Sequence, residues 1–234
     1  PVRSKVESHI LQFCIVASQV SRNKVNYFKK MECLLGIRFN DYVLVAADAI
    51  DARSIVVNSH NEEKFCILSD KLLIAVSGES GDTTQFSEYI QKNIQLYKMR
   101  NEYELSPKAA AHFTRRNLAE YLRSRTPYNC NLLMAGYDDV EKKADLFFMD
   151  YLATCVELPY CAHGYGGYFT LSTMDAYYKP DLSQAEGMEL MKKCVGEIGK
   201  RLVINLPRFK VRIVDKDGIR SMGEINTKDL KIFD

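Results

Sequence analysis

Asp48 and Lys64 are the side chains in this sequence best placed to do chemistry together. Asp48 follows an apolar run that begins at Tyr42, and Lys64 opens the short apolar segment KFCIL sixteen residues later. An antiparallel arrangement of the two segments could bring these charges into contact. A buried carboxylate and ammonium in contact can tune the proton of a nearby nucleophile. Most buried ion pairs are structural, so this pairing alone does not identify catalysis.

The residues ahead of Asp48 predict a β-hairpin that carries its carboxylate to the end of a buried strand. Two apolar runs, 34–39 and 42–47, flank the break at Asn40 and Asp41. Between Met31 and Gly36 there is no Thr or Ser, and only Cys33 carries a nucleophilic side chain. The expected ion pair therefore lacks an obvious hydroxyl partner.

Other motifs give little indication of nucleotide binding, catalysis or metal binding. The segment Gly78 to Asp82 lacks GxxxxGK[ST], and its two acids would repel a phosphate. The HGYGG segment, 163–167, predicts a tight turn in which a Cβ would clash, and His163 is expected to be partly buried with its hydrogen bonds satisfied. The seven cysteines form no metal-binding spacing and suit free, buried thiols in a reducing compartment. No metal or cofactor is therefore expected.

The remaining pattern alternates pairs of helices with groups of strands. Asp82, with Gln85, is expected to cap a helix that ends near Asn101; Ser106 caps a second helix, and Ser183 and Glu186 form a capping box for a later one. A further helix is expected at 168–178, and strands at 54–58, 64–68, 71–78, 130–137, 144–150 and on both sides of the turn 216–218. Two sheets packed face to face with helices outside, an α+β four-layer αββα sandwich, bury all these faces economically.

Composition excludes several classes of protein. The chain has 234 residues, 47% of them hydrophobic and 26% charged, which suits one large globular domain. No apolar run approaches the length of a membrane span, so no membrane partner is expected. Residues 31–234 carry 26 basic and 29 acidic side chains, a poor balance for binding nucleic acid.

Residues 1–30 differ from the rest, with six Lys or Arg and one Glu. The VAS segment at 16–18 weakly fits a secretory cleavage site, and the basic character also fits a mitochondrial transit segment. We instead expect residues 1–30 to be an extension that is disordered or absent from the native protein, with residues 31–234 forming the domain and Met31 as the true start.

Several long segments, in order, resemble the β-type subunits of the 20S proteasome, most closely their type-2 group at the β4 ring position. They are YVLVAAD, SGESGDTTQFSEYIQKNIQLYKMRNEYELSP, RRNLAEYLRSRTPYNCNLLMAGYD, MDYL, ELPYCAHGYGG and VRIVDKDGI. The resemblance covers Met31 to about Arg220. It implies the αββα N-terminal-nucleophile hydrolase fold, in agreement with the layer argument.

The resemblance also implies a catalytic site in which several of the family's active-site residues are replaced. Active members use an N-terminal threonine as nucleophile and base, and Glu32 occupies that position here. The family's Asp and Lys correspond to Asp48 and Lys64, which would be vestigial. Supporting Ser, Asp and Ser residues correspond to Tyr165, Leu202 and Asn205. No catalytic residue is therefore expected.

These implications predict a non-catalytic subunit of the 20S core particle, in the cytoplasm and nucleus, needed for proteasomal, ubiquitin-dependent protein degradation. Its partners would be other β subunits in a seven-membered ring, the opposite β ring and an α ring, while neighbouring subunits cleave the protein substrates. One alternative is an active threonine-type endopeptidase matured at another bond, for which only Cys33 offers a nucleophile. Another is a free-standing αββα binding domain, which would be a stable monomer.

Overall fold

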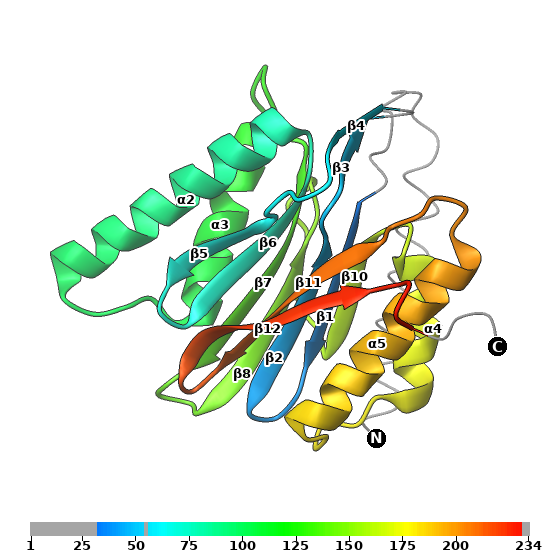
Figure 1. The fold of residues 1–234 in the computed structure, drawn as a ribbon. Helices are drawn as coiled ribbons and strands as arrows, with labels where there is room; N and C mark the ends of the chain where they lie inside the picture. The colour runs from blue at the N-terminus through cyan, green and yellow to red at the C-terminus, as the bar shows by residue number, and fades with distance from the viewer. Residues whose placement is uncertain (1–31, 54–55, 231–234) are drawn as a thin grey trace.

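Two five-stranded antiparallel sheets, packed face to face, form the centre of the molecule (Figure 1). The computed structural model describes residues 32–53 and 56–230. In spatial order, the first sheet contains β10 (Tyr160–Gly164), β1 (Cys33–Arg38), β2 (Tyr42–Asp48), β11 (Arg208–Asp215) and β12 (Gly218–Asn226). The second contains β5 (Phe65–Ser69), β6 (Leu72–Gly78), β7 (Cys130–Asp138), β8 (Lys143–Met149) and β9 (Cys155–Glu157).

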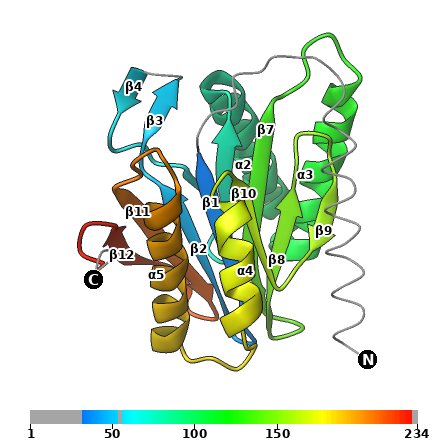
Figure 2. The ribbon, with the colours of Figure 1, turned by 90° about the vertical axis from the view of Figure 1, so that its right-hand side faces the viewer.

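Two helices cover the outer face of each sheet. The helices α2 (Ser80–Asn101) and α3 (Pro107–Leu122) lie on the second sheet, whereas α4 (Gly167–Tyr177) and α5 (Gln184–Arg201) lie on the first (Figures 1 and 2). A small separate ribbon of β3 (Asp51–Arg53) and β4 (Val56–Ser59) projects beyond the first sheet. The predicted αββα sandwich is confirmed.

Three apolar layers hold the four layers of backbone together. Successive residues of a strand face opposite sides, so Leu34 contributes to the layer between the sheets and Leu35 to the layer under α4 and α5. A third layer lies between α2, α3 and the second sheet. Because both faces of the central strands are buried, β2 is apolar at every position before Asp48. The sheets approach closely at Gly36, where a Cβ would lie 3.0 Å from Leu146.

Most predicted elements are confirmed, including the Ser106 cap and the Ser183–Glu186 capping box. The predicted Asp82 cap is wrong. Helix α2 already begins at Ser80, after Glu79, because the Glu79 N–H is satisfied by the Asn129 carbonyl. The Asp82 carboxylate instead accepts a hydrogen bond from the Asn129 N–H at 2.9 Å and ties the helix to the start of β7.

The strand predicted at 54–58 corresponds to β4, Val56–Ser59, which lies in the β3–β4 ribbon rather than in a main sheet. Its first two residues lie outside the part of the chain that the structure describes, as does the expected extension, residues 1–30. The six cysteines in the described part are free; four are buried, while Cys66 and Cys155 are half-buried. Among the described helices, none is long and apolar enough to cross a membrane.

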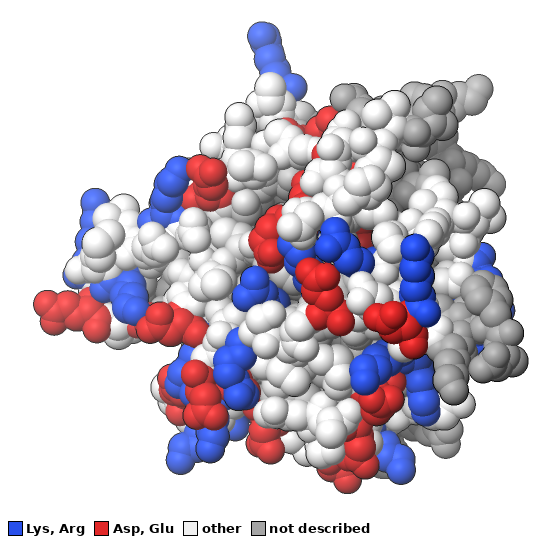
Figure 3. All heavy atoms as spheres, in the orientation of Figure 1, with Lys and Arg blue, Asp and Glu red and all other residues white. Residues whose placement is uncertain are grey.

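Charged side chains of both signs are interspersed on the face seen in Figure 3. Ion pairs involving the residues of β11 include Lys210 with Glu63 at 3.0 Å and Arg208 with Glu224 at 3.7 Å. This face therefore presents no extended field of one sign.

His163 is a structural residue between the sheets. Its ring stacks on Phe148, with 4.0 Å between the centroids, and its Nε2 lies 3.1 Å from the Leu132 carbonyl. The prediction of a satisfied histidine is confirmed, although the side chain is more deeply buried than expected. Burial lowers the pKa of His163 to about 4, so its ring is neutral at physiological pH.

This histidine should make the inter-sheet contact sensitive to acid. The unfolded chain takes up a proton near pH 6.5 but the folded chain only near pH 4, so stability is lost as pH falls from 6.5 towards 4. The total effect is on the order of 3 kcal/mol. The His163→Gln variant keeps a donor for the Leu132 carbonyl but has no group that titrates in this range. It should therefore reduce the dependence of stability on pH.

Hydrogen exchange of the β7 and β10 amides in the native protein, corrected for intrinsic rates, measures the effect. Replacement of the exposed His112 by Gln is the matched control and should leave the pH dependence unchanged. An identical acid response in wild type and His163→Gln would contradict the assignment.

Candidate functional site

The structure brings Asp48 and Lys64 together, as predicted, but not by antiparallel pairing of their segments, because β2 and β5 belong to different sheets. Asp48 ends β2 in the first sheet, and Lys64 immediately precedes β5 in the second. The Lys64 backbone carbonyl accepts a hydrogen bond from Val76 of β6, which fixes the start of its strand. The Lys64 Nζ lies 2.8 Å from Asp48 Oδ2, and both residues are buried.

Each charge of this pair has further partners. The Lys64 ammonium also donates to the Ile50 carbonyl at 2.9 Å and lies 3.5 Å from Glu32 Oε1. The Asp48 carboxylate accepts from the Cys33 N–H at 2.8 Å and from the Ile50 N–H at 3.3 Å. Two of the three ammonium donors therefore have hydrogen-bond acceptors, and the Glu32 carboxylate adds a second nearby negative charge. These partners help to offset the cost of burying the two charges.

Glu32 lies at the start of β1 and bridges the two sheets. Its Oε2 accepts a hydrogen bond from the Gly78 N–H at 2.7 Å, while its Oε1 faces Lys64. A carboxylate held by a cation and a backbone N–H is an acceptor and offers no proton for a nucleophile to lose. Glu32 therefore balances part of the Lys64 charge and accepts the hydrogen bond of the Gly78 N–H.

Cys33, the next residue, is a poor nucleophile in this setting. It is 1% exposed, and burial, together with the adjacent Asp48 charge, raises the pKa of its thiol far above the usual range. The thiolate is the reactive form of cysteine, so this thiol stays protonated and inert at neutral pH.

The HGYGG turn packs against the start of β1, and two of its glycines are required because a Cβ would clash there. Gly164 has a φ of +82°, and a Cβ there would lie 1.8 Å from the Glu32 carbonyl oxygen. At Gly166, a Cβ would lie 2.1 Å from the Cys33 sulfur. The prediction of a turn without room for side chains is confirmed.

The three positions that the resemblance assigns to supporting residues hold side chains with other contacts. The Tyr165 ring lies 6.5 Å from that of Tyr168. Leu202 ends α5 and packs on the apolar layer beneath it, while Asn205 is exposed in the following loop. Within residues 32–53 and 56–230, neither Leu202 nor Asn205 forms a hydrogen bond with Asp48 or Lys64.

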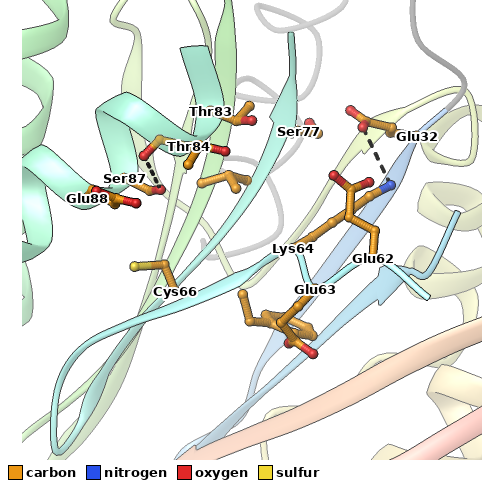
Figure 4. Close-up of a pocket in the computed structure, with 12 residues that line it drawn as sticks. Glu32, Glu62, Glu63, Lys64, Cys66, Ser77, Thr83, Thr84, Ser87 and Glu88 are labelled. Carbon is orange, nitrogen blue, oxygen red and sulfur yellow. Dashed lines mark hydrogen bonds and ion pairs between the residues drawn. The ribbon is translucent and has the colours of Figure 1, made fainter. Parts of the chain in front are cut away.

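A pocket of about 200 Å³ opens beside Lys64 (Figure 4). It lies between β5, β6 and the first turns of α2, with Glu32 at one side. Its lining consists of Glu32, Glu62, Glu63, Lys64, Phe65, Cys66, Val76, Ser77, Thr83, Thr84, Ser87 and Glu88. Burial raises the pKa of the Cys66 thiol to about 11, so this wall of the pocket is uncharged.

Carboxylate oxygens of Glu32, Asp51 and Glu62 lie within 4.8 Å of one another. Such oxygens suit a hard divalent cation. The Lys64 ammonium, however, already supplies positive charge 3.5 Å from Glu32, and an acidic cluster alone does not identify a metal.

Sequence reasoning found the ion pair but missed the pocket. The one available signal was Ser77, a polar residue within the otherwise apolar strand LLIAVSG. The other charged and hydroxyl lining residues come from α2, from the segment before β5 and, for Glu32, from the start of β1. Their proximity depends on the tertiary fold.

Comparisons with known proteins agree with this geometry. A family model described as "Proteasome subunit" matches residues 29–214. The chain is 46% identical over 198 residues to "Proteasome subunit beta type-4" of Saccharomyces cerevisiae, covering 85% of this chain and 100% of that protein. It is 50% identical over 190 residues to "Proteasome subunit beta type-2-A" of Arabidopsis thaliana, covering 81% and 92%. A "Probable proteasome subunit beta type-4" of Schizosaccharomyces pombe is 47% identical over 193 residues.

Replacing one partner of the buried pair should lower the free energy of unfolding more than replacing both charged side chains together. Lys64→Met leaves the buried Asp48 carboxylate without its cation, which should cost about 3–5 kcal/mol. In the double variant with Asp48→Asn, the side-chain oxygen at position 48 can still accept from the Cys33 N–H. We expect the second substitution to recover roughly half of the loss.

Denaturant midpoints and the yield of folded protein measure both costs. Lys92→Met is the matched control, because it breaks the exposed pair with Glu88 and should cost less than about 0.5 kcal/mol. Additive losses at positions 48 and 64 would show that the two charges are not coupled.

Proposed function

The chain belongs to the proteasome β-subunit family, and from this premise we propose that it is a β subunit of the 20S core particle without a nucleophile of its own. The main support for this proposal is the Glu32 carboxylate, which contacts Lys64 and the Gly78 N–H. Active members of the family have a terminal threonine at this position. A carboxylate bound in this way cannot supply a hydroxyl with an adjacent free amine. In this proposal, Asp48 and Lys64 have a structural role only.

The proposed role is structural. The chain would occupy one place in a seven-membered β ring, stacked on the opposite β ring and on an α ring, in the cytoplasm and nucleus. Neighbouring subunits would cleave the proteins delivered for ubiquitin-dependent and other proteasomal degradation. Exposed apolar side chains such as Met99 at 73% and Tyr168 at 72% would be available for contact with other subunits.

Two other functions have less support. An active endopeptidase would have to use Cys33, whose buried thiol has a strongly raised pKa. A free-standing binding domain has less support because the matched relatives are named as proteasome subunits.

Restoring the threonine alone should not restore catalysis. In Glu32→Thr preceded by a cleavable leader ending in Gly, Tyr165, Leu202 and Asn205 still lack the polar groups of active members. Residues that position a nucleophile and its base act as a unit, so activity should stay below about one hundredth of that of an active subunit. Hydrolysis of fluorogenic peptides is measured in particles whose own active subunits are blocked.

The matched comparison adds Tyr165→Ser, Leu202→Asp and Asn205→Ser to the same graft. Activity that rises only in this combined variant supports the proposal. Substantial turnover from the threonine graft alone would show that the supporting residues are dispensable and that the lost nucleophile is the whole difference.

Isolated from its partners, the 31–234 segment should self-associate. Apolar surface that other subunits cover in the ring would be exposed to water. Sedimentation velocity at micromolar concentration measures this. A monodisperse monomer would contradict the ring-subunit proposal and favour the free-standing domain.

A further inference from the structure

The exposed side of α3 and the loop after it concentrate positive charge. Residues 107–129 contain five exposed basic side chains, which are Lys108, Arg115, Arg116, Arg123 and Arg125. Glu120 is the only acid in this range. With these six residues set aside, the rest of residues 31–234 carries 21 basic and 28 acidic side chains. The charge of α3 is therefore opposite in sign to that of the remaining domain.

Helical geometry gathers these charges on one face. Lys108, Arg115 and Arg123 are separated by seven and eight residues, close to two helical turns each, so their side chains lie along one stripe. The buried residues of the helix, such as Ala110 and Leu118, lie on the opposite side and pack on the second sheet. The basic stripe is therefore the outward face of α3.

Most of these cations have no carboxylate partner. Among the described residues, Arg116 pairs with Glu120 at 3.1 Å, whereas Lys108, Arg123 and Arg125 form no ion pair. By contrast, three exposed cations of α5 each pair with a glutamate about one turn away. The outward face of α3 thus keeps its capacity to bind anions from another molecule.

Arg115 connects this face to a rigid turn that exposes two apolar side chains. Its Nε donates to the Ala153 carbonyl at 3.2 Å, in the turn that joins β8 to β9 beside α3 (Figure 2). The Asp150 carboxylate accepts hydrogen bonds from two backbone N–H groups of the same turn, at 2.8 and 3.0 Å. Tyr151 and Leu152 are each 37% exposed there. A surface that is ordered in advance loses less entropy on binding.

The composition of this surface indicates the chemistry of its partner. Unpaired guanidinium groups bind carboxylates through two parallel hydrogen bonds. Arg and Tyr are also enriched at the positions of protein interfaces that contribute most to affinity. A nucleic acid fits less well, because the rest of the domain is net negative and would repel a phosphate backbone. The surface therefore favours an acidic protein segment.

We propose that the outward face of α3, together with the turn that carries Tyr151 and Leu152, binds a carboxylate-rich segment of a neighbouring subunit. Asp or Glu side chains of that segment would pair with Lys108, Arg123 and Arg125, while an apolar side chain would lie on the turn. This inference rests on the proposed function, because it names the chemistry of one contact between subunits of the particle.

Zero-length cross-linking in purified particles tests the contact directly. A water-soluble carbodiimide converts a carboxylate to an O-acylisourea, and a lysine amine in contact displaces the urea and forms an amide. Peptide mass spectrometry should find Lys108 joined to an Asp or Glu of another chain. Arg123→Lys keeps the charge and adds an amine on the same face, which should form a second link between chains. In the matched control, Arg201→Lys on α5 should link to Glu197 of its own helix.

Charge reversal tests whether the contact contributes to assembly. Lys108→Glu with Arg123→Glu breaks no ion pair of the described chain, so folding should be unaffected. Expressed together with wild type, this variant should enter particles at least about fivefold less, because like charges would face each other. Lys142→Glu with Lys216→Glu makes the same change of net charge at two exposed hairpin turns and should enter as wild type does. The ratio of variant to wild-type peptides in particles measures both effects.

No link between chains from Lys108 or from the Arg123→Lys amine, or equal entry of the α3 variant and its control, would overturn the inference. Photo-crosslinking of α3 to nucleic acid in the same particles would also overturn it. Wild-type chain that is missing from purified particles would contradict the proposed function itself, whereas wild type that is present without these links contradicts only the contact.

Discussion

The buried contact between the Asp48 carboxylate and the Lys64 ammonium joins the two sheets where three segments meet. Asp48 ends β2, the Cys33 N–H that it binds starts β1, and Lys64 leads into β5 of the other sheet. Burying either charge alone would cost several kcal/mol. The fold can contain this pair only while all three segments keep their positions, so the register of both sheets depends on it.

Apolar packing surrounds this polar junction and makes it rigid. The layer between the sheets is continuous from Leu34 to Phe148, and the close approach at Gly36 leaves little room for the sheets to slide. Lys64 and Asp48 are thereby excluded from water, which strengthens their attraction. The non-directional apolar layers supply most of the driving force, while the ion pair and the Glu32 bridge select one alignment.

The residue at position 32 determines which contacts are made at this junction. A hydroxyl and a free amine there would have an ammonium and a backbone N–H beside them. The Glu32 carboxylate instead accepts from Gly78 and faces Lys64, so the donors are already used.

The sequence by itself determined the αββα layers and the hairpin that carries Asp48. These follow from periodic burial, capping residues and strand ends, which are local properties of the chain. Only the tertiary structure decided that α2 begins at Ser80, since a carbonyl from the distant Asn129 satisfies the preceding N–H. It also decided that Glu32 reaches Gly78 and that Asp48 meets Lys64 across the two sheets. Hydrogen bonds between residues far apart in the chain depend on how the sheets are placed, and no local pattern records that placement.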